Sequence, residues 1–199
     1  MKTLQIICAG GHGKVVAEVA EQCRYERIVF IDRDWPGRTA HGRWPIVSDT
    51  VLDDDSDVFC AAGSNSLRKQ LFEAHNLENS PILVHPAAIV SPSATLGAGC
   101  LVMPGAVINA DARIGKGAIL NTSCSVDHDC NIGDFVHVSP GARLAGNVTL
   151  ADGAWIGIGA SIIQNISIGH NAIVAAGAAV VSPVQDNCKV GGVPAARLH

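Results

Sequence analysis

His128 stands between two carboxylates, in the segment Asp127-His128-Asp129. A neighbouring carboxylate can fix the tautomer of an imidazole and stabilise its charged form, and a general base needs both. A second histidine, His137, follows nine residues later. The sequence therefore predicts general-base chemistry centred on His128. The alternative is an ordinary surface histidine that happens to lie beside an aspartate.

A metal site is the other chemistry open to clustered histidine, aspartate and cysteine. Zinc needs three or four converging ligands. Cys124 and Cys130 fall on inward positions of the repeat described next, whereas His128 falls on an outward one. A β-helical metal lyase would instead need His128, His137 and His170 to converge. We expect no metal, and the lyase remains an alternative.

A period of six residues must position these side chains. Every sixth residue from Val90 to Val180 is Val, Leu or Ile, in sixteen consecutive units, and the residue two places earlier is Ala or Cys in thirteen of them. Such a period fits neither an α-helix nor a lone strand and indicates a repeat architecture. It predicts a parallel β-helix whose triangular coils each take three hexapeptides, with His128 and His137 pointing outward.

A glycine-rich segment, Gly10-Gly11-His12-Gly13, follows the first apolar run of the chain. A turn of this kind between a strand and a helix points backbone N–H groups at an anion, although the full dinucleotide fingerprint and the P-loop spacing are both absent. Asp32 and Asp34 follow the second apolar run, where parallel sheets bind a ribose or base. The pattern predicts a mononucleotide pocket, and a plain tight connection is the alternative.

Alternating apolar runs and helical patterns before the repeat predict a small parallel α/β sheet. The expected strands are residues 2–9, 27–31, 58–62 and 82–84, and the expected helices are residues 14–24 and 67–75. Residues 35–47 are expected to form an irregular loop that leads to a short edge strand. Asp53 to Asp55 are expected near a helix end or a turn. Gly63, Ser64 and Asn65 are expected to cap the second helix and to line the same sheet edge as Asp32.

The composition limits the cellular context. The chain has 199 residues, a net charge of −4 and no basic run, so nucleic acid is not an expected partner. The first apolar run is too short to span a membrane and continues into glycines rather than a cleavage site, so we expect neither membrane insertion nor a signal peptide. Seven cysteines with no CxxC pair favour the reducing cytoplasm.

Several stretches resemble the sugar acetyltransferases of the left-handed β-helix superfamily. The nearest likeness is to the family of the bacillosamine-pathway N-acetyltransferase and the sialic-acid O-acetyltransferase-like proteins. The resemblance runs along nearly the whole chain, and the similar stretches are residues 10–13, 30–34, 63–68, 121–147 and 190–195. It implies a Rossmann-like α/β domain that binds a nucleotide sugar (residues 1–84). A left-handed parallel β-helix acetyltransferase domain with a C-terminal tail would follow (residues 85–199).

The resemblance also assigns roles to single positions. His128 and Asp129 would be the catalytic residues, as general base and orienting carboxylate. Close relatives carry Glu at the second position, so the shorter Asp129 puts this contact in doubt and leaves Asp127 as the alternative partner. The nucleotide sugar would be held by Gly11, His12, Gly13, Asp32, Asp34, Gly63 and Asn65, and acetyl-CoA by Asn121, His137, Gly146, Ala176 and Pro194. The N–H of Gly146 would donate to the developing oxyanion.

The activity implied is acetyl-CoA-dependent N-acetylation of a nucleotide-linked amino sugar, such as a UDP-4-amino-4,6-dideoxy sugar, by direct transfer within a homotrimer. An O-acetyltransferase acting on a sugar such as sialic acid is one alternative. A non-catalytic trimeric scaffold is another. The predicted nucleotide pocket favours the first activity over one on a free sugar, and a scaffold predicts no response to acetyl-CoA.

Overall fold

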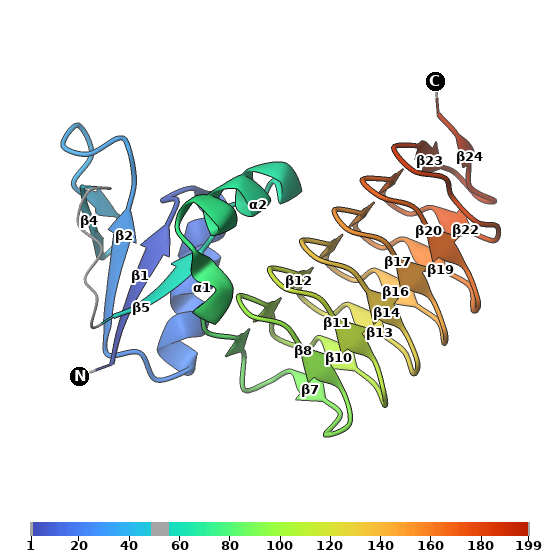
Figure 1. The fold of residues 1–199 in the computed structure, drawn as a ribbon, viewed down its shortest axis with the longest axis horizontal. Coiled ribbons are helices and arrows are strands. Elements are labelled where there is room, and N and C mark those ends of the chain that lie inside the picture. The colour runs from blue at the N-terminus through green and yellow to red at the C-terminus, as the bar shows by residue number, and fades with distance from the viewer. Residues whose placement is uncertain (1, 49–55, 199) are drawn as a thin grey trace.

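The C-terminal part is a parallel β-helix whose short strands follow the hexapeptide register (Figure 1). The computed structural model describes residues 2–48 and 56–198. Within them, β7 to β22 are sixteen two-residue strands, and each ends on the branched residue of its unit. Their bounds are Ile89–Val90, Thr95–Leu96, Leu101–Val102, Val107–Ile108, Arg113–Ile114, Ile119–Leu120, Ser125–Val126, Asn131–Ile132, His137–Val138, Arg143–Leu144, Thr149–Leu150, Trp155–Ile156, Ser161–Ile162, Ser167–Ile168, Ile173–Val174 and Ala179–Val180. The predicted architecture is confirmed.

Each coil takes three strands, because a strand pairs in parallel with the third strand after it, as β10 does with β13. The stacked coils form a six-stranded sheet (β7 to β22), a five-stranded sheet (β8 to β20) and an eight-stranded sheet that runs from β6 to β24. We call the eight-stranded sheet the docked face, because the N-terminal part packs on it. Residues 109–112, 127–130, 145–148 and 163–166, which connect the other two sheets, form the corner opposite the docked face, the far corner.

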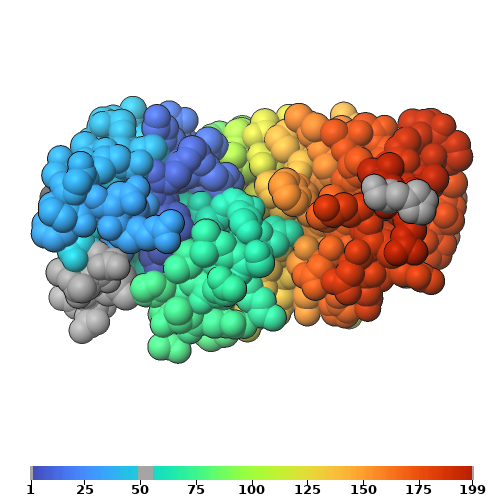
Figure 2. Space-filling model, turned by 90° about the horizontal axis from the view of Figure 1, so that it is seen from above, coloured from blue at the N-terminus to red at the C-terminus, as the bar shows by residue number. Residues whose placement is uncertain are grey.

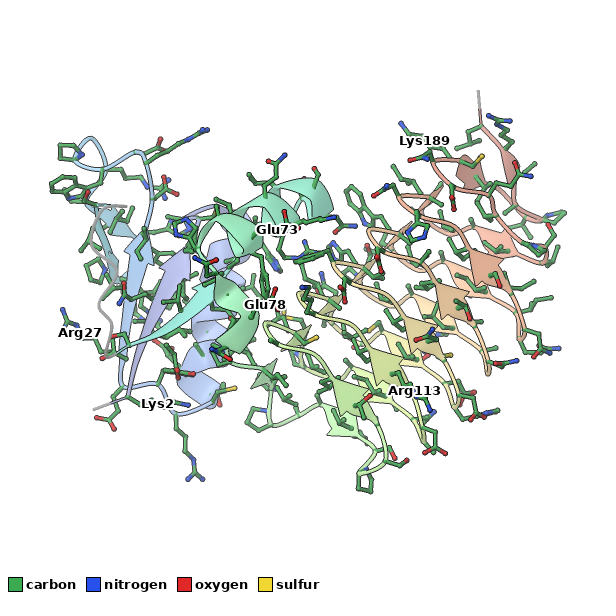
Figure 3. The ribbon with its side chains drawn as sticks, viewed as in Figure 1. Lys2, Arg27, Glu73, Glu78, Arg113 and Lys189 are labelled. Atoms are coloured by element: carbon green, nitrogen blue, oxygen red, sulfur yellow. The ribbon has the colours of Figure 1, made fainter. Side chains whose placement is uncertain are left out.

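The interior of the coil is aliphatic and closely filled. Cys124 and Cys130 are 0% and 1% exposed and lie among the branched side chains, as the register predicted. The outer positions of the five-stranded sheet are polar, and Arg113 projects from it (Figure 3). The last strands, β23 (Lys189–Gly191) and β24 (Ala196–Arg197), end the docked face with an antiparallel pair.

The N-terminal part is a five-stranded sheet in the order β3-β4-β2-β1-β5. The strands are β1 (Thr3–Ile7), β2 (Arg27–Ile31), β3 (Ala40–His41), β4 (Trp44–Val47) and β5 (Asp57–Cys60), and the helices are α1 (Gly11–Gln22), α2 (Asn65–Ala74) and the short 3₁₀ helix η1 (Leu77–Asn79). Because β1, β2, β4 and β5 are parallel, their carboxyl ends meet at one sheet edge. The edge strand on the β4 side is β3, which pairs antiparallel with β4, so the strand after the loop lies one place further in than expected.

Two helices, α1 and α2, pack the N-terminal part against the coil. Val16 and Ala20 of α1 share a buried apolar cluster with Leu101 and Ile119 on the docked face. The residues of α2 lie against the middle coils, as the space-filling view shows (Figure 2). The carboxyl edge of the small sheet is therefore held beside the docked face.

The first helix begins earlier than expected. The sequence predicted a tight turn at residues 10–13 and a helix from Lys14, but α1 begins at Gly11 with Gly10 as its N-cap. Gly13 is needed inside the first turn, because a Cβ there would lie 2.6 Å from the carbonyl oxygen of Cys8 and 2.9 Å from the Phe30 ring. Helix α2 also begins two residues early, and Ser64 caps it as predicted by accepting from the N–H of Leu67.

One expected strand belongs to the other part of the molecule. Residues 82–84 were expected to complete the N-terminal sheet, but β6 (Leu83–Val84) pairs with β9 on the docked face. The reason is visible in the register, since Val84 stands six residues before Val90 and extends the repeat by one unit. The prediction for Asp53 to Asp55 falls outside the described residues.

Candidate active site

His128 lies on the far corner with its side chain 59% exposed. Its Nδ1 is 2.8 Å from Oδ2 of Asp129, and its backbone N–H donates to Oδ1 of Asp127 at 2.8 Å. The ring contact that the sequence left open is thus made by Asp129, while Asp127 holds the turn and also accepts from Asn109. Asp129 has φ +59°, a conformation that Asp tolerates better than most residues. Nε2 of the ring has no hydrogen-bond partner in the described part of the chain and can accept a proton.

The two carboxylates raise the pKa of His128 above its ordinary value. The hydrogen bond that Nδ1–H of His128 donates to Asp129 is the largest cause, and the charge of Asp127 adds to it. A ring with this pair of neighbours can accept a proton and stabilise the resulting imidazolium. The arrangement suits general-base chemistry at the surface of the coil.

Gly146 lies beneath the His128 ring on the next coil. A Cβ at Gly146 would meet Cε1 and Nε2 of His128 at 2.6 Å, so the ring can rest there only because this residue has no side chain. Its backbone N–H has no acceptor in the described part of the chain, whereas the N–H of His128, one coil earlier, is satisfied by Asp127. The base therefore lies beside an unused hydrogen-bond donor.

His137 points out of the coil, as predicted, but it lies on the docked face and is only 9% exposed because the N-terminal part covers it. Asn121 Nδ2 lies 3.0 Å from its Nε2. The Asn121 oxygen accepts the N–H of Thr122, so the amide nitrogen faces the ring as a donor and Nε2 must accept. The proton of neutral His137 is therefore on Nδ1, an atom that finds no partner among the residues described.

His12, in the first turn of α1, faces His137 across the junction with the coil, with ring centroids 6.4 Å apart. Burial, with a smaller contribution from the nearby charge of Arg68, lowers the pKa of His12 to about 4 and that of His137 to about 3. Both rings are therefore neutral at physiological pH. This pair can offer hydrogen bonds but carries no charge.

Arg68 of α2 is 1% exposed and joins the two parts of the molecule. Its guanidinium donates to carbonyl oxygens of the coil at Gly117 (2.7 Å) and Phe135 (2.8 Å). It also donates to Ala62 at 3.0 Å and to the side-chain oxygen of Asn65 at 2.8 Å. Burial lowers the pKa of Arg68 to about 10. Neutral acceptors thus surround the charge and fix α2 to the docked face.

At the carboxyl edge of the small sheet, side chains hold the segment before α1. Asp32 Oδ2 accepts the N–H of Ala9 at 2.7 Å, Arg38 donates to the carbonyl of Ala9, and His41 Nε2 donates to that of Gly10 at 2.8 Å. Helix α1 has no side-chain cap and no acidic residue in its first turn. A Cβ added at Gly10 would contact nothing within 4 Å. This open helix start can receive an anion.

The remaining residues predicted for the nucleotide lie at the same edge, with one different role. Gly11, His12 and Gly13 form the first turn of α1, Gly63 lies close to His12, and Asp34 donates its N–H to Oδ1 of Asp32. The amide of Asn65 is already engaged, because its nitrogen donates to the carbonyls of Gly153 and Ala154. The contact of Asn65 with a substrate stays a prediction. In the structure, its side chain binds the start of α2 to the coil.

An apolar groove of about 450 Å³ runs along the docked face beyond His137. It is lined by His137, Ser139, Pro140, Trp155, Gly157, Ile158, Ile173, Val174, Ala175 and Ala176. Ala176, predicted to contact acetyl-CoA, is in this set. Pro194, also predicted, lies in the exposed tail between β23 and β24. The groove can take a narrow, apolar chain with one end at His137.

The predicted residues form two groups on opposite sides of the prism. His128, Asp129 and Gly146 lie on the far corner, while His12, Asn121 and His137 lie at the docked face. A corner between two sheets of a triangular prism cannot touch the third sheet, so one chain does not bring His128 to His137. A site that uses both groups must take them from two chains.

Sequence reasoning missed Arg38, His41 and Trp155, and it noted Arg68 without giving it a role. Only Trp155 carries a signal in the sequence, as a large aromatic residue at an outward position of the repeat. Among residues 2–48 and 56–198, no three His, Cys, Asp or Glu side chains are grouped as metal ligands. In the same ranges, no helix has the length and apolar character needed to cross a membrane.

Comparison with known proteins finds similarity to sugar acetyltransferases along the whole chain. Residues 3–75 match the family described as the PglD N-terminal domain. The acetyltransferase domain of PglB from Neisseria gonorrhoeae, solved with acetyl coenzyme A, is 38% identical with a TM-score of 0.93 over 99% of each chain. A mutant of perosamine N-acetyltransferase from Caulobacter crescentus, solved with CoA and GDP-perosamine, is 36% identical with a TM-score of 0.92, over 100% of this chain and 98% of that one.

A curated relative is also similar over a shorter stretch. The UDP-N-acetylbacillosamine N-acetyltransferase of Bacillus subtilis is 38% identical over 114 residues, so the match spans half of this chain and half of that protein. The two solved structures, by contrast, match over almost their full length. The chain belongs to the family of sugar N-acetyltransferases that join a PglD-type N-terminal domain to a hexapeptide β-helix.

Proposed function

We propose that this protein transfers the acetyl group of acetyl-CoA to the amine of a nucleotide-linked 4-amino-4,6-dideoxy sugar. The observation that carries the proposal is the His128–Asp129 pair beside the unused N–H of Gly146. His128 takes the proton of the attacking amine, and the Gly146 N–H donates to the oxyanion that forms on the thioester carbon. A positioned base contributes roughly 10²–10⁴ in rate and one oxyanion donor roughly 10²–10³.

We assign the nucleoside diphosphate of the sugar substrate and the pantetheine chain of acetyl-CoA to sites at or beside the docked face. The start of α1, from Gly11 to Gly13, binds the diphosphate, and Asp32 and Asp34 bind the nucleoside. The apolar groove takes the pantetheine chain of acetyl-CoA, so the thioester lies near His137. Support comes from the open helix start and from the groove that ends at this histidine. Residues 1–84 then act as the nucleotide-sugar domain and residues 85–199 as the acetyltransferase domain, with β6 belonging to the coil.

The proposal requires an oligomer, and we assign a homotrimer. His128 of one chain must meet the docked face of another, so two different surfaces are in contact. Such a heterologous contact closes into a ring when its rotation allows. Support comes from the opposite positions of the two groups in one chain and from the exposure of His128. We place the trimer in the cytoplasm, in keeping with the seven unpaired cysteines.

A substrate panel tests the activity. The protein is incubated with acetyl-CoA and UDP-, GDP-, dTDP- or CMP-linked sugars, each as the amino sugar and as its hydroxy counterpart, and free CoA is followed. CoA release with one nucleotide amino sugar is expected, with matching acetylated product by mass spectrometry. No release with any member of the panel overturns the proposed function. Release with hydroxy sugars alone would favour the O-acetyltransferase instead.

Replacing Asp129 with asparagine should change the pH profile in a defined direction. The base must be unprotonated to act, and Asp129 raises the pKa of His128, so the wild-type acid limb lies above the ordinary histidine value. Asp129→Asn should move the acid limb of kcat/KM to lower pH and lower kcat at neutral pH on the order of 10²-fold. Asp111→Asn is the matched control, since Asp111 holds the same corner position one coil earlier with the same φ of 59°. An unmoved acid limb would contradict the assignment of His128 as base.

A further inference from the structure

Trp155 is the outward residue of strand β18 on the docked face. It lies where the N-terminal part stops covering the coil. The outward residues of five successive strands on this face, β9, β12, β15, β18 and β21, are Leu101, Ile119, His137, Trp155 and Ile173. The first three are buried, whereas Trp155 is 44% exposed. It also forms part of the wall of the apolar groove. The indole therefore lies at the boundary between the covered cluster and the groove.

The indole is held flat against the imidazole of His137. The two rings are 3° from parallel with centroids 5.8 Å apart, because His137 and Trp155 are direct partners in the parallel pairing of β15 and β18. The indole N–H donates to Oγ of Ser139 at 2.9 Å, which fixes the ring's rotation. Stacked pairs at this separation contribute about 0.5–1.5 kcal/mol beyond burial.

His137 depends on this stack because hydrogen bonds hold only one edge of its ring. Nε2 accepts from Asn121, but the proton on Nδ1 has no partner in the described chain. The Nδ1 edge of the ring therefore has no hydrogen bond among the described residues to fix its tilt within the surrounding packing. The indole face lies parallel to the ring and supplies the second restraint, whereas the His12 ring is tilted by 38° with its centroid 6.4 Å away.

We propose that Trp155 is a positioning residue that holds the His137 ring in place at the end of the acetyl-CoA groove, with Ser139 as its anchor. The proposal rests on the role given to His137 above. His137 then contacts the acyl thioester from a fixed orientation, and Trp155 acts through it. Errors of about 1 Å in the placement of a reacting group can lower the rate roughly 10²-fold, so a restraint on one ring matters.

Three variants separate the effect of the ring stack on His137 from the effect of the hydrogen bond to Ser139. Trp155→Ala removes both the stack and the anchor and should lower kcat/KM for acetyl-CoA roughly 10- to 100-fold, with most of the loss in kcat. Trp155→Phe keeps a flat ring without the N–H and should retain most of the activity. Ser139→Ala also removes only the anchor, so it should retain about as much activity as Trp155→Phe. If Trp155→Phe is as impaired as Trp155→Ala, or if Trp155→Ala is as active as wild type, the proposal fails.

A second measurement needs no sugar substrate. With ¹⁵N-labelled histidine, His137 should show one neutral tautomer, protonated on Nδ1. Trp155→Ala should give a mixture of tautomers or broadened signals at His137, while the signals of exposed His170 stay unchanged. Unaltered His137 signals in Trp155→Ala would overturn the positioning role. If the substrate panel shows no acetylation, the proposed function fails, and these spectra still decide whether Trp155 holds His137.

Discussion

Replacement of His128 with alanine should lower kcat by roughly 10²–10⁴ and leave the affinity for acetyl-CoA close to wild type. The loss follows because the amine then has no positioned acceptor for its proton. Affinity is expected to persist because the exposed His128 side chain makes its one side-chain hydrogen bond with the adjacent Asp129. The rate is measured as CoA release with the sugar that wild type acetylates, and the affinity by calorimetry.

The matched control is His170→Ala. His170 is also exposed at a corner of the coil, its backbone N–H is held by Asp186, and it lies outside both groups of the site. Its removal should leave kcat unchanged. Near-normal kcat in His128→Ala would show that another group takes the proton and would contradict the proposed mechanism.

Mixing variants tests where the site lies. Chains carrying His128→Ala and chains carrying His137→Ala should each be nearly inactive alone. Reassembled together in equal amounts, they should recover about a quarter of wild-type activity, because in a closed ring each site would draw its two histidines from different chains. No recovery would indicate that both histidines of a site come from the same chain, against the separation of the far corner from the docked face.

The coil could be predicted almost strand by strand, and the physical reason is local. Each hexapeptide buries its own branched residue and its own small residue, so the register alone separates inward from outward positions. Cys124 and Cys130 followed that rule into the core. The same rule applied to Val84 would have placed β6 in the coil as well.

The hexapeptide register does not predict which part of the coil the N-terminal part covers. His137 is outward by the repeat, yet it is buried, and His12 of α1 faces its ring. Asn65 was expected at the nucleotide and is held by carbonyls more than eighty residues away in the chain. Contacts of this range depend on how two folded surfaces meet, and no local pattern records that.

The separation of His128 from His137 on two sides of the prism could have been predicted from the repeat. His128 and His137 are nine residues apart, which suggests proximity. Nine residues are one and a half hexapeptides, so the second histidine lies on a different side of the coil. The repeat contained this information, because three units close one coil.

Replacing Arg68 with methionine should produce the largest loss of stability among these variants. Methionine is apolar and leaves the carbonyl oxygens of Gly117, Phe135 and Ala62 without their buried donor. A hydrogen bond from a charged group contributes about 1.5–3 kcal/mol, so the loss should be at least about 3 kcal/mol. For a chain of this size, that lowers the thermal midpoint by roughly 6–12 °C.

Two variants keep this prediction testable. Lys69→Met changes the neighbouring residue, whose ion pair with Glu73 is 3.9 Å long and exposed, and should cost less than about 0.5 kcal/mol. Arg68→Lys keeps the charge, but its single ammonium cannot reach all the acceptors, so it should fall between the two. Equal midpoints for Arg68→Met and Lys69→Met, at the same protein concentration, would show that α2 docks without the guanidinium.

Arg68 should also affect how stability depends on pH. His12 and His137 have pKa values of about 4 and 3 in the folded chain, against an ordinary value of 6.5. As pH falls from 6.5 towards 4, the unfolded chain therefore binds more protons than the folded one, and stability is lost. Arg68→Met removes the nearby charge while the burial of both rings remains, so the folded pKa values rise and the fall in midpoint between pH 7 and pH 4 should be smaller than in wild type or Lys69→Met. An equal fall in all three would mean that burial alone keeps the two histidines neutral.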